Sequence, residues 1–231
     1  MKTSMADIVH KILKQLKSLS NPEAVANMSR YGINPKNAYG ISIPQLRTIA
    51  KEIGRDHDLA QQLWGSRIHE ARILASYVDE PMRVTEAQLE RWVKGFDSWD
   101  ICDQVCGLFE ETPYAYQKAI EWSSRKEEFV KRAAFTLMAG LAIHDKGASD
   151  EQFVRFFPII EQAVTDDRNF VKKAVNWALR NIGKRNKSLN KKAIELARGI
   201  QLMDSKTAKW IASDALRELR SRAIQKRIKE G

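Results

Sequence analysis

The sequence lacks any apolar run near the length of about 20 residues that an α-helix needs to cross a bilayer. The segment from Met1 to Leu19 mixes basic and apolar residues. It has neither the continuous apolar core nor the small-residue cleavage site of a signal peptide. These absences disfavour membrane and secreted proteins, and we expect a cytoplasmic chain.

Cysteine and histidine are scarce, with two cysteines and four scattered histidines. Cys102 and Cys106 lie four residues apart in a predicted helix, where a disulfide fits poorly, and no further Cys or His lies nearby to complete a zinc site. A Gly-rich phosphate loop, a paired-histidine helix and a nucleophile elbow are also missing. The sequence therefore predicts neither a metal nor a cofactor, and two small buried thiols.

Sustained alternation of apolar and polar residues, the pattern of half-buried strands, is absent. Apolar residues instead recur at spacings of three and four, and Asn21-Pro22 and Ser42-Ile43-Pro44 resemble helix starts. The pattern predicts an all-α fold. Its clearest helical stretches are Leu46–Ile53, Leu89–Phe96 and Ile194–Ile200.

Two segments echo each other about 40 residues apart, Phe129–Ala134 and Phe170–Val175. Weaker copies lie at Arg67–Ala75 and Ala208–Leu216. Paired helices repeating at this period are typical of HEAT-like repeats, which stack into an α-solenoid because one pair cannot bury its apolar face alone. We therefore expect a single domain over residues 1–231, with the second helix of each pair lining a concave face.

The charge balance is strongly basic, with 39 Lys and Arg against 29 Asp and Glu and a net charge of +10. A basic chain of this kind usually binds a polyanion, most often nucleic acid. No helix has a spare apolar face opposite a lysine stripe, so a membrane surface is disfavoured. The basic residues of the strong echoes, which would line a basic concave face toward duplex nucleic acid, are Lys131, Arg132, Lys172 and Lys173.

An acidic cluster occupies Asp97–Asp103. Trp99 and Asp103 lie four residues apart and so share one face of the predicted helix, whereas we expect Asp100 to cap the helix start together with Ser98. An acid facing a polyanion weakens binding, so Asp103 in that place should serve another purpose. The alternative is a helix-capping cluster beside a core tryptophan.

Two further candidates come from the echoed helices. Arg132 offers a guanidinium that can bind phosphate in a fixed geometry, and Trp177 offers a ring that can stack on a sugar or base. Each also has a structural alternative: a surface ion pair for Arg132 and a core position for Trp177.

Together these residues resemble a known family, the AlkD-type alkylpurine DNA glycosylases built of HEAT-like repeats. The similarity covers nearly the whole chain, and the Trp-Asp-x-x-Asp element together with the two later echoes is its most specific part. Ser98 departs from the family, in which an aromatic residue precedes the tryptophan. The matching segments are Asn21–Glu23, Met28–Tyr31, Tyr39–Arg47, Ser98–Asp103, Val130–Ala134 and Lys173–Arg180.

The resemblance implies roles for five residues. Trp99 and Trp177 would flank the deoxyribose of the damaged nucleotide, and Asp103 would stabilise the developing sugar cation and hold the attacking water. Arg132 would grip a nearby phosphate, and Tyr31 would approach the DNA backbone.

The implied activity is excision of cationic N3- or N7-alkylated purines from duplex DNA by hydrolysis of the N-glycosidic bond, without a deep base pocket and by a monomer. Some relatives keep the fold, lack this activity and bind branched DNA, so a non-catalytic binder of branched or damaged DNA is one alternative. A HEAT-type protein-interaction scaffold is another, although a scaffold needs no excess of positive charge.

Overall fold

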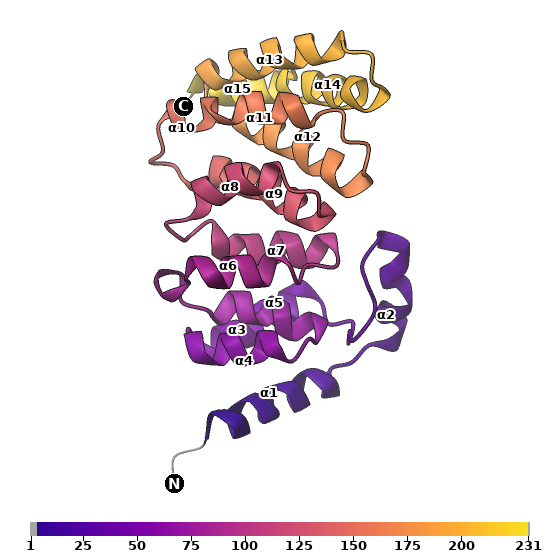
Figure 1. Ribbon diagram of the computed structural model, residues 1–231, viewed down its shortest axis with the longest axis vertical. Helices are drawn as coiled ribbons and strands as arrows, with labels where there is room; N and C mark the ends of the chain where they lie inside the picture. The colour runs from indigo at the N-terminus through magenta and orange to yellow at the C-terminus, as the bar shows by residue number, and fades with distance from the viewer. Residues whose placement is uncertain (1–3, 231) are drawn as a thin grey trace. The chain divides into compact units, whose positions relative to one another are not determined.

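Every regular element in the computed structural model, which describes residues 4–230, is a helix (Figure 1). The described chain contains no strand, so the all-α prediction is confirmed. It divides into two compact units, Met1–Thr112 (unit 1) and Pro113–Gly231 (unit 2). That residues 1–231 form a single domain stays a prediction. No helix among the described residues is both long and apolar enough to span a bilayer.

Unit 1 begins with two helices that precede its repeats and continues with helices joined by short turns. Its elements are α1 (Met5–Ser18), α2 (Pro22–Met28), the 3₁₀-helix η1 (Ser29–Tyr31), α3 (Ile43–Ile53), α4 (His57–Gly65), α5 (His69–Val78), the 3₁₀-helix η2 (Pro81–Arg83), α6 (Glu86–Val93) and α7 (Trp99–Phe109).

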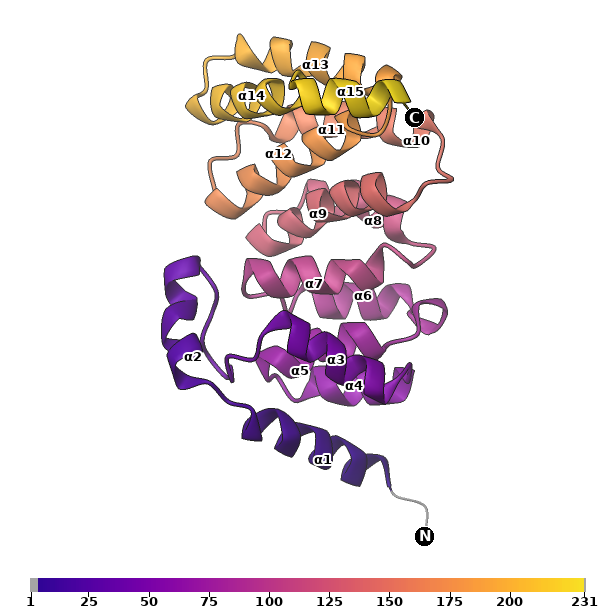
Figure 2. The same cartoon turned by 180° about the vertical axis from the view of Figure 1, so that it is seen from behind.

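Unit 2 consists of three helical pairs, with the short α10 before the second pair, followed by a last helix, and its final helices lie together at the C-terminal end (Figure 2). Its elements are α8 (Ala115–Ser123), α9 (Glu128–His144), α10 (Asp150–Val154), α11 (Phe156–Ala163), α12 (Asn169–Gly183), α13 (Lys187–Gln201), α14 (Lys206–Leu219) and α15 (Arg222–Glu230).

The helix starts follow the capping signals in the sequence. The Asn21 side chain accepts a hydrogen bond from the Ala24 N–H, and Pro22 occupies the first helical position of α2. Ser42 and Gln45 form a capping box at the start of α3. These contacts satisfy amide groups that a helix end otherwise leaves unpaired, which explains why both helices begin where the sequence predicts.

The echoed segments lie in the more buried helix of each pair, namely α5, α9, α12 and α14. In α9 every residue from Arg132 to Ala142 is buried, and the helix packs against α8 on one side and α12 on another. A helix that is apolar over most of its circumference is buried on most sides. The echoed segments therefore belong to the more buried helix of each pair, and that these helices line a concave face stays a prediction.

The first turn of α5 joins three other segments of unit 1. The buried Glu70 carboxylate accepts backbone N–H groups of Tyr39 and Gly40 at 2.6–2.9 Å. His69 Nε2 lies 2.8 Å from Asp100 Oδ2 of α7, and Arg72 donates to Asp97 Oδ1 at 2.8 Å. Because a buried charge is tolerated only when it is paired and hydrogen-bonded, these contacts fix the N-terminal loop and the start of α7.

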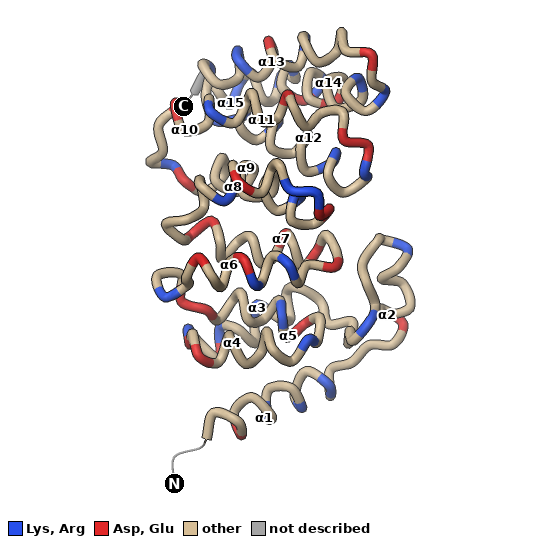
Figure 3. The backbone as a smooth tube through the Cα atoms, viewed as in Figure 1, with Lys and Arg blue, Asp and Glu red and all other residues tan. Residues whose placement is uncertain are grey.

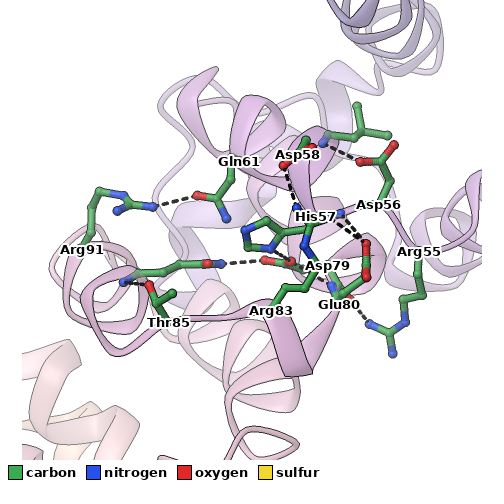
Figure 4. Close-up of polar contacts among 12 residues, drawn as sticks. Arg55, Asp56, His57, Asp58, Gln61, Asp79, Glu80, Arg83, Thr85 and Arg91 are labelled. Atoms are coloured by element: carbon green, nitrogen blue, oxygen red, sulfur yellow. Dashed lines mark hydrogen bonds and ion pairs between the residues drawn. The ribbon is translucent and has the colours of Figure 1, made fainter.

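The other end of α5 is held by a second buried carboxylate, Asp79 (Figure 4). Gln88 Nε2 donates to Asp79 Oδ2 at 2.6 Å, and His57 Nδ1 lies 2.7 Å from Asp79 Oδ1. Arg55 donates to the Asp79 carbonyl. The network binds α4, α5 and α6 together, so α5 is fixed at both of its ends.

Gly40 lies where only glycine fits. Its φ of +74° is in the left-handed region, and an added Cβ would lie 2.5 Å from the Asn21 carbonyl oxygen. The loop can therefore approach both α2 and Glu70 closely.

Replacing Glu70 with glutamine should lower the free energy of unfolding by about 2–3 kcal/mol, because the amide NH₂ cannot accept the backbone N–H groups and their charge-assisted bonds are lost. Urea unfolding followed by circular dichroism measures the change. Glu52→Gln, at an exposed position of α3, is the matched control and should cost less than about 0.5 kcal/mol. Equal losses in the two variants would contradict the role of Glu70.

Asp100 should make unit 1 sensitive to acid. Burial raises the pKa of its carboxyl, but hydrogen bonds from His69 and Ser98 outweigh burial and hold that pKa below its usual value. The stabilisation is therefore present above the unfolded pKa of about 3.9 and is lost as the pH falls through the folded pKa. Asp100→Asn should be less stable than the wild type at pH 7, and the gap in unfolding free energy should narrow below about pH 4. A gap independent of pH would contradict this.

Candidate nucleic-acid interface

Helix α7 has a buried side, which packs into the core, and a half-buried side. Ile101, Cys102 and Cys106 are buried, and the two cysteines are not joined by a disulfide, as the sequence predicts. Trp99 and Asp103, four residues apart, are half-buried. A helix brings residues with this spacing to one side, so the side of α7 that faces away from the core carries an indole ring and a carboxylate.

The start of α7 is fixed by Asp100 rather than by a serine cap. Ser98 is the N-cap residue, but its buried hydroxyl donates to Asp100 Oδ1 at 2.7 Å instead of accepting a backbone N–H. Asp100 lies in the first turn, where its charge is favourable to the helix dipole, and binds His69 of α5. The prediction is right that Ser98 is the N-cap residue and that Asp100 lies in the first turn, but it is wrong that the Ser98 side chain caps the helix, since its hydroxyl is bonded to Asp100.

Trp99 is bound to the N-terminal part of the chain. Its indole Nε1–H donates to the backbone carbonyl of Tyr31 at 2.8 Å. The Tyr31 side chain is 70% exposed. The structure thus brings together two of the sequence-predicted site residues, with the phenol of Tyr31 open to solvent and the indole of Trp99 fixed in orientation.

In unit 2, Lys131 is part of an ion-pair cluster. Its Nζ lies 2.9 Å from Asp166 Oδ2, and Arg168 binds the same carboxylate at 2.6 Å. The hydrogen bonds from Arg168, followed by that from Lys131, lower the pKa of Asp166 to about 2. In Figure 3 basic and acidic segments adjoin at the start of α9. The positive charge of Lys131 is therefore partly compensated within the protein.

Arg132 is 6% exposed, less than either sequence interpretation supposes. Its NH1 donates to the Phe170 carbonyl at 2.7 Å, and the Phe129 and Phe170 rings lie 5.6 Å apart. Both echoed segments begin with these phenylalanines, so the echo places equivalent turns of α9 and α12 against each other. Arg132 fixes the start of α12.

Helix α12 carries the remaining candidates. Lys173 is exposed. Trp177 is half-buried, which fits neither a fully buried core ring nor a fully exposed stacking ring. Lys172 Nζ lies 5.7 Å from the centre of the Trp210 ring on α14, within the range of a cation–π contact. Trp210 is 43% exposed and was missed as a candidate. Its place in the weak echo at 208–216 was the available signal.

Acids of α14 offset part of the positive charge of α12. Arg180 NH1 lies 2.6 Å from Glu218 Oε2, Lys184 binds the same carboxylate at 2.8 Å, and Asn176 donates to Asp214 at 2.7 Å. Lys172 and Lys173 lie nearer the N-terminal end of α12 and take no part in these contacts with the acids of α14. Two of the four residues with implied roles in chemistry, Trp99 and Asp103, thus lie in unit 1, and Arg132 and Trp177 lie in unit 2.

Comparison with solved structures supports the HEAT-like fold. One similar chain is described as "a new family of proteins related to the HEAT-like repeat DNA glycosylases with affinity for branched DNA structures". It has a TM-score of 0.75 and 19% identity, over 91% of this chain and 95% of that one. A designed armadillo repeat protein in complex with a (KR)4 peptide gives a TM-score of only 0.35 at 14% identity, over 80% of this chain and 79% of that one, and carries no argument.

Comparison with curated proteins gives no match. The family model described as "DNA alkylation repair enzyme" matches residues 12–219, which include every candidate residue described above. The chain therefore belongs to the DNA alkylation repair enzyme family.

Proposed function

We propose that the protein is a DNA glycosylase that excises cationic N3- and N7-alkylated purines from duplex DNA. The observation that carries the proposal is the pairing of Trp99 and Asp103 on the half-buried side of α7 in a member of a DNA alkylation repair family. Asp100 already serves the helix start. Asp103 lies one turn further along α7, on the half-buried side that carries Trp99.

The reaction suits these side chains. Alkylation at N3 or N7 makes the purine cationic, so the bond between its N9 and the sugar C1′ breaks with the electron pair leaving on the base, which departs neutral. The sugar becomes an oxocarbenium-like cation, as in glycoside hydrolysis, and water adds to C1′ and loses a proton. A carboxylate and the electron-rich faces of aromatic rings both stabilise such a cation.

Each proposed residue has one role in this scheme. Asp103 stabilises the sugar cation and orients the water, and Trp99 and Trp177 contact the deoxyribose. Arg132 and Tyr31 act on the phosphate backbone. Lys131, Lys172 and Lys173 supply positive charge toward that backbone, with Lys173 the most exposed of the three.

Binding to undamaged duplex should weaken steeply with salt, because the net charge of +10 favours release of counterions from the DNA. The slope of log K against log salt concentration should be roughly −0.9 per phosphate neutralised, with little sequence preference. Fluorescence anisotropy from 50 to about 300 mM KCl measures it. Affinity independent of salt would contradict an electrostatic interface.

Asp103→Asn should lower the single-turnover rate of 7-methylguanine release by about 100-fold or more, a loss of roughly 3 kcal/mol of transition-state stabilisation. DNA affinity should hold or improve, since a charge that repels phosphate is removed. Asp58→Asn, which removes a negative charge from α4 in the same unit, is the matched control and should release base at the wild-type rate.

The alternative helix-supporting role for Asp103 gives the opposite pattern, with a lower melting temperature and an unchanged rate per folded molecule. A well-folded, fully active Asn variant would remove Asp103 from the mechanism.

Trp177→Ala should slow release through loss of contact with the sugar. Arg132→Ala should weaken both binding and release.

A second candidate function is non-catalytic binding of branched DNA. It is favoured by the similar structure whose description names affinity for branched DNA, although at 19% identity that likeness shows the fold alone. A wild-type protein that binds a four-way junction more tightly than a duplex and releases no methylated base would support this candidate over the glycosylase.

A further inference from the structure

A basic cavity in unit 1 lies outside the residues assigned above. It has a volume of about 610 Å³ and is lined by four cations and one carboxylate, together with the Trp64 ring. The lining comes from the segment between α2 and α3, from α4 and its connection to α5, from α5 and α6, and from the connection between α6 and α7. In Figure 1 the α2–α3 segment and the start of α5 lie at the same edge of the unit, and the Asn37 carbonyl accepts the His69 N–H at 2.9 Å. The charged lining residues are Lys36, Arg67, Arg72, Arg91 and Asp97.

The carboxylate of this cavity is already satisfied. Asp97 accepts a hydrogen bond from Arg72 at 2.8 Å and another from Asn34 at 3.0 Å. Over residues 4–230, neither Lys36 nor Arg67 is paired with a carboxylate. Two cations therefore face the cavity with their charge uncompensated, which favours an anionic ligand.

Arg67 adopts a backbone conformation that its side chain disfavours. Its φ is +59°, in the left-handed region where a residue with a Cβ is strained and glycine is not. The residue ends the turn after α4, a position that glycine commonly fills. Strain of this kind persists where the surrounding structure enforces it and gathers at functional sites. An arginine at a position better suited to glycine indicates that the Arg67 side chain has a function, such as binding a ligand, that offsets the strain.

One wall of the cavity is rigid and aromatic. The Trp64 ring stacks on Trp92 with centroids 4.3 Å apart and planes 5° from parallel. Arg72, 8% exposed, lies 5.7 Å from the Trp64 ring, and its buried Nε finds no hydrogen-bond partner among the described residues. Such a wall holds Arg72 in place, and a side chain that is already fixed loses less entropy when an anion binds.

We propose that this cavity binds a phosphate of the nucleic-acid backbone through Arg67 and Lys36, with Arg91 at its rim. The identity of the ligand rests on the proposed function, since a DNA-binding chain presents this anion to its surface. A guanidinium matches two phosphate oxygens at once. The Asp97 side of the cavity leads within two residues to Trp99, so a phosphate held there would anchor the strand next to the proposed site of chemistry.

Arg67→Gly tests the proposal, because glycine removes the guanidinium and also relieves the strain. The dissociation constant for an undamaged duplex should rise about fivefold or more, which corresponds to loss of one charge-assisted contact. The slope of log K against log salt should become less steep by roughly 0.9. The melting temperature should stay equal or rise. Weakened binding by a protein at least as stable as the wild type cannot be explained by misfolding.

Two control variants separate position from net charge. Arg67→Lys keeps the charge but loses the two-pronged geometry, and its affinity should lie between those of the wild type and Arg67→Gly. Arg83→Ala removes one positive charge at the opposite end of α5, where Arg83 pairs with Asp58 and Glu80 (Figure 4), and should leave the dissociation constant unchanged. Equal weakening by Arg83→Ala and Arg67→Gly would overturn the proposal, since only total charge would then matter.

Two further outcomes would overturn it. If Arg67→Gly bound DNA as tightly as the wild type and melted at a higher temperature, the strained backbone at Arg67 would serve no ligand. Inorganic phosphate that stabilises the wild type but not Arg67→Gly, with DNA affinity unchanged, would assign the cavity to a small anion. Because the duplex is undamaged, the comparison stands whether or not the wild type releases alkylated bases, and its failure leaves the Asp103 test intact.

Discussion

The placement of the proposed chemistry in unit 1 depends on the first turn of α5. Glu70 takes up backbone N–H groups of the N-terminal loop, His69 binds Asp100 at the start of α7, and Arg72 binds the segment before α7. A buried carboxylate without partners costs several kcal/mol, so this turn is stable only when the loop and α7 are both in place. The loop and α7 in turn carry Tyr31 and Trp99. The same interaction therefore stabilises the unit and positions two proposed site residues.

Much of the positive charge in this basic chain is compensated inside the protein. Lys131 pairs with Asp166, and Arg180 and Lys184 pair with Glu218. Composition alone overstates how many cations remain for a polyanion. Lys173, near the start of α12, remains exposed, and a helix N-terminus adds a favourable partial positive charge for phosphate.

The sequence was sufficient to predict the helices, the repeat and the family, because period, capping residues and echoes are local properties. Asn21, Pro22 and Ser42 begin helices as predicted. It could not predict Arg132 as a buried residue bonded to Phe170, nor Glu70 as the organiser of the N-terminal loop, because both depend on contacts between segments far apart in the chain. The left-handed backbone of Arg67 gives no sequence signal either, since arginine is not a residue that marks such a turn.

The acidic cluster at residues 97–103 could be a helix cap or part of a reactive site, and the structure divides these roles among its members. Asp97 is bonded to Arg72 and Asn34, and Asp100 lies in the first turn of α7, bonded to His69 and Ser98. Burial, the neighbouring thiol of Cys102 and the charge of Asp103 raise the pKa of the Cys106 thiol well above its usual value, so that thiol stays neutral. Asp100 is taken up by His69 and Ser98, and the Cys106 thiol carries no charge. The negative charge on the side of α7 that carries Trp99 is therefore that of Asp103. A negative charge on a surface that binds DNA weakens that binding, because it repels phosphate. The cost is offset when a cation forms beside the carboxylate during the reaction, since the carboxylate and the aromatic ring then both stabilise it. Cleavage of an alkylated nucleoside forms such a cation on the sugar.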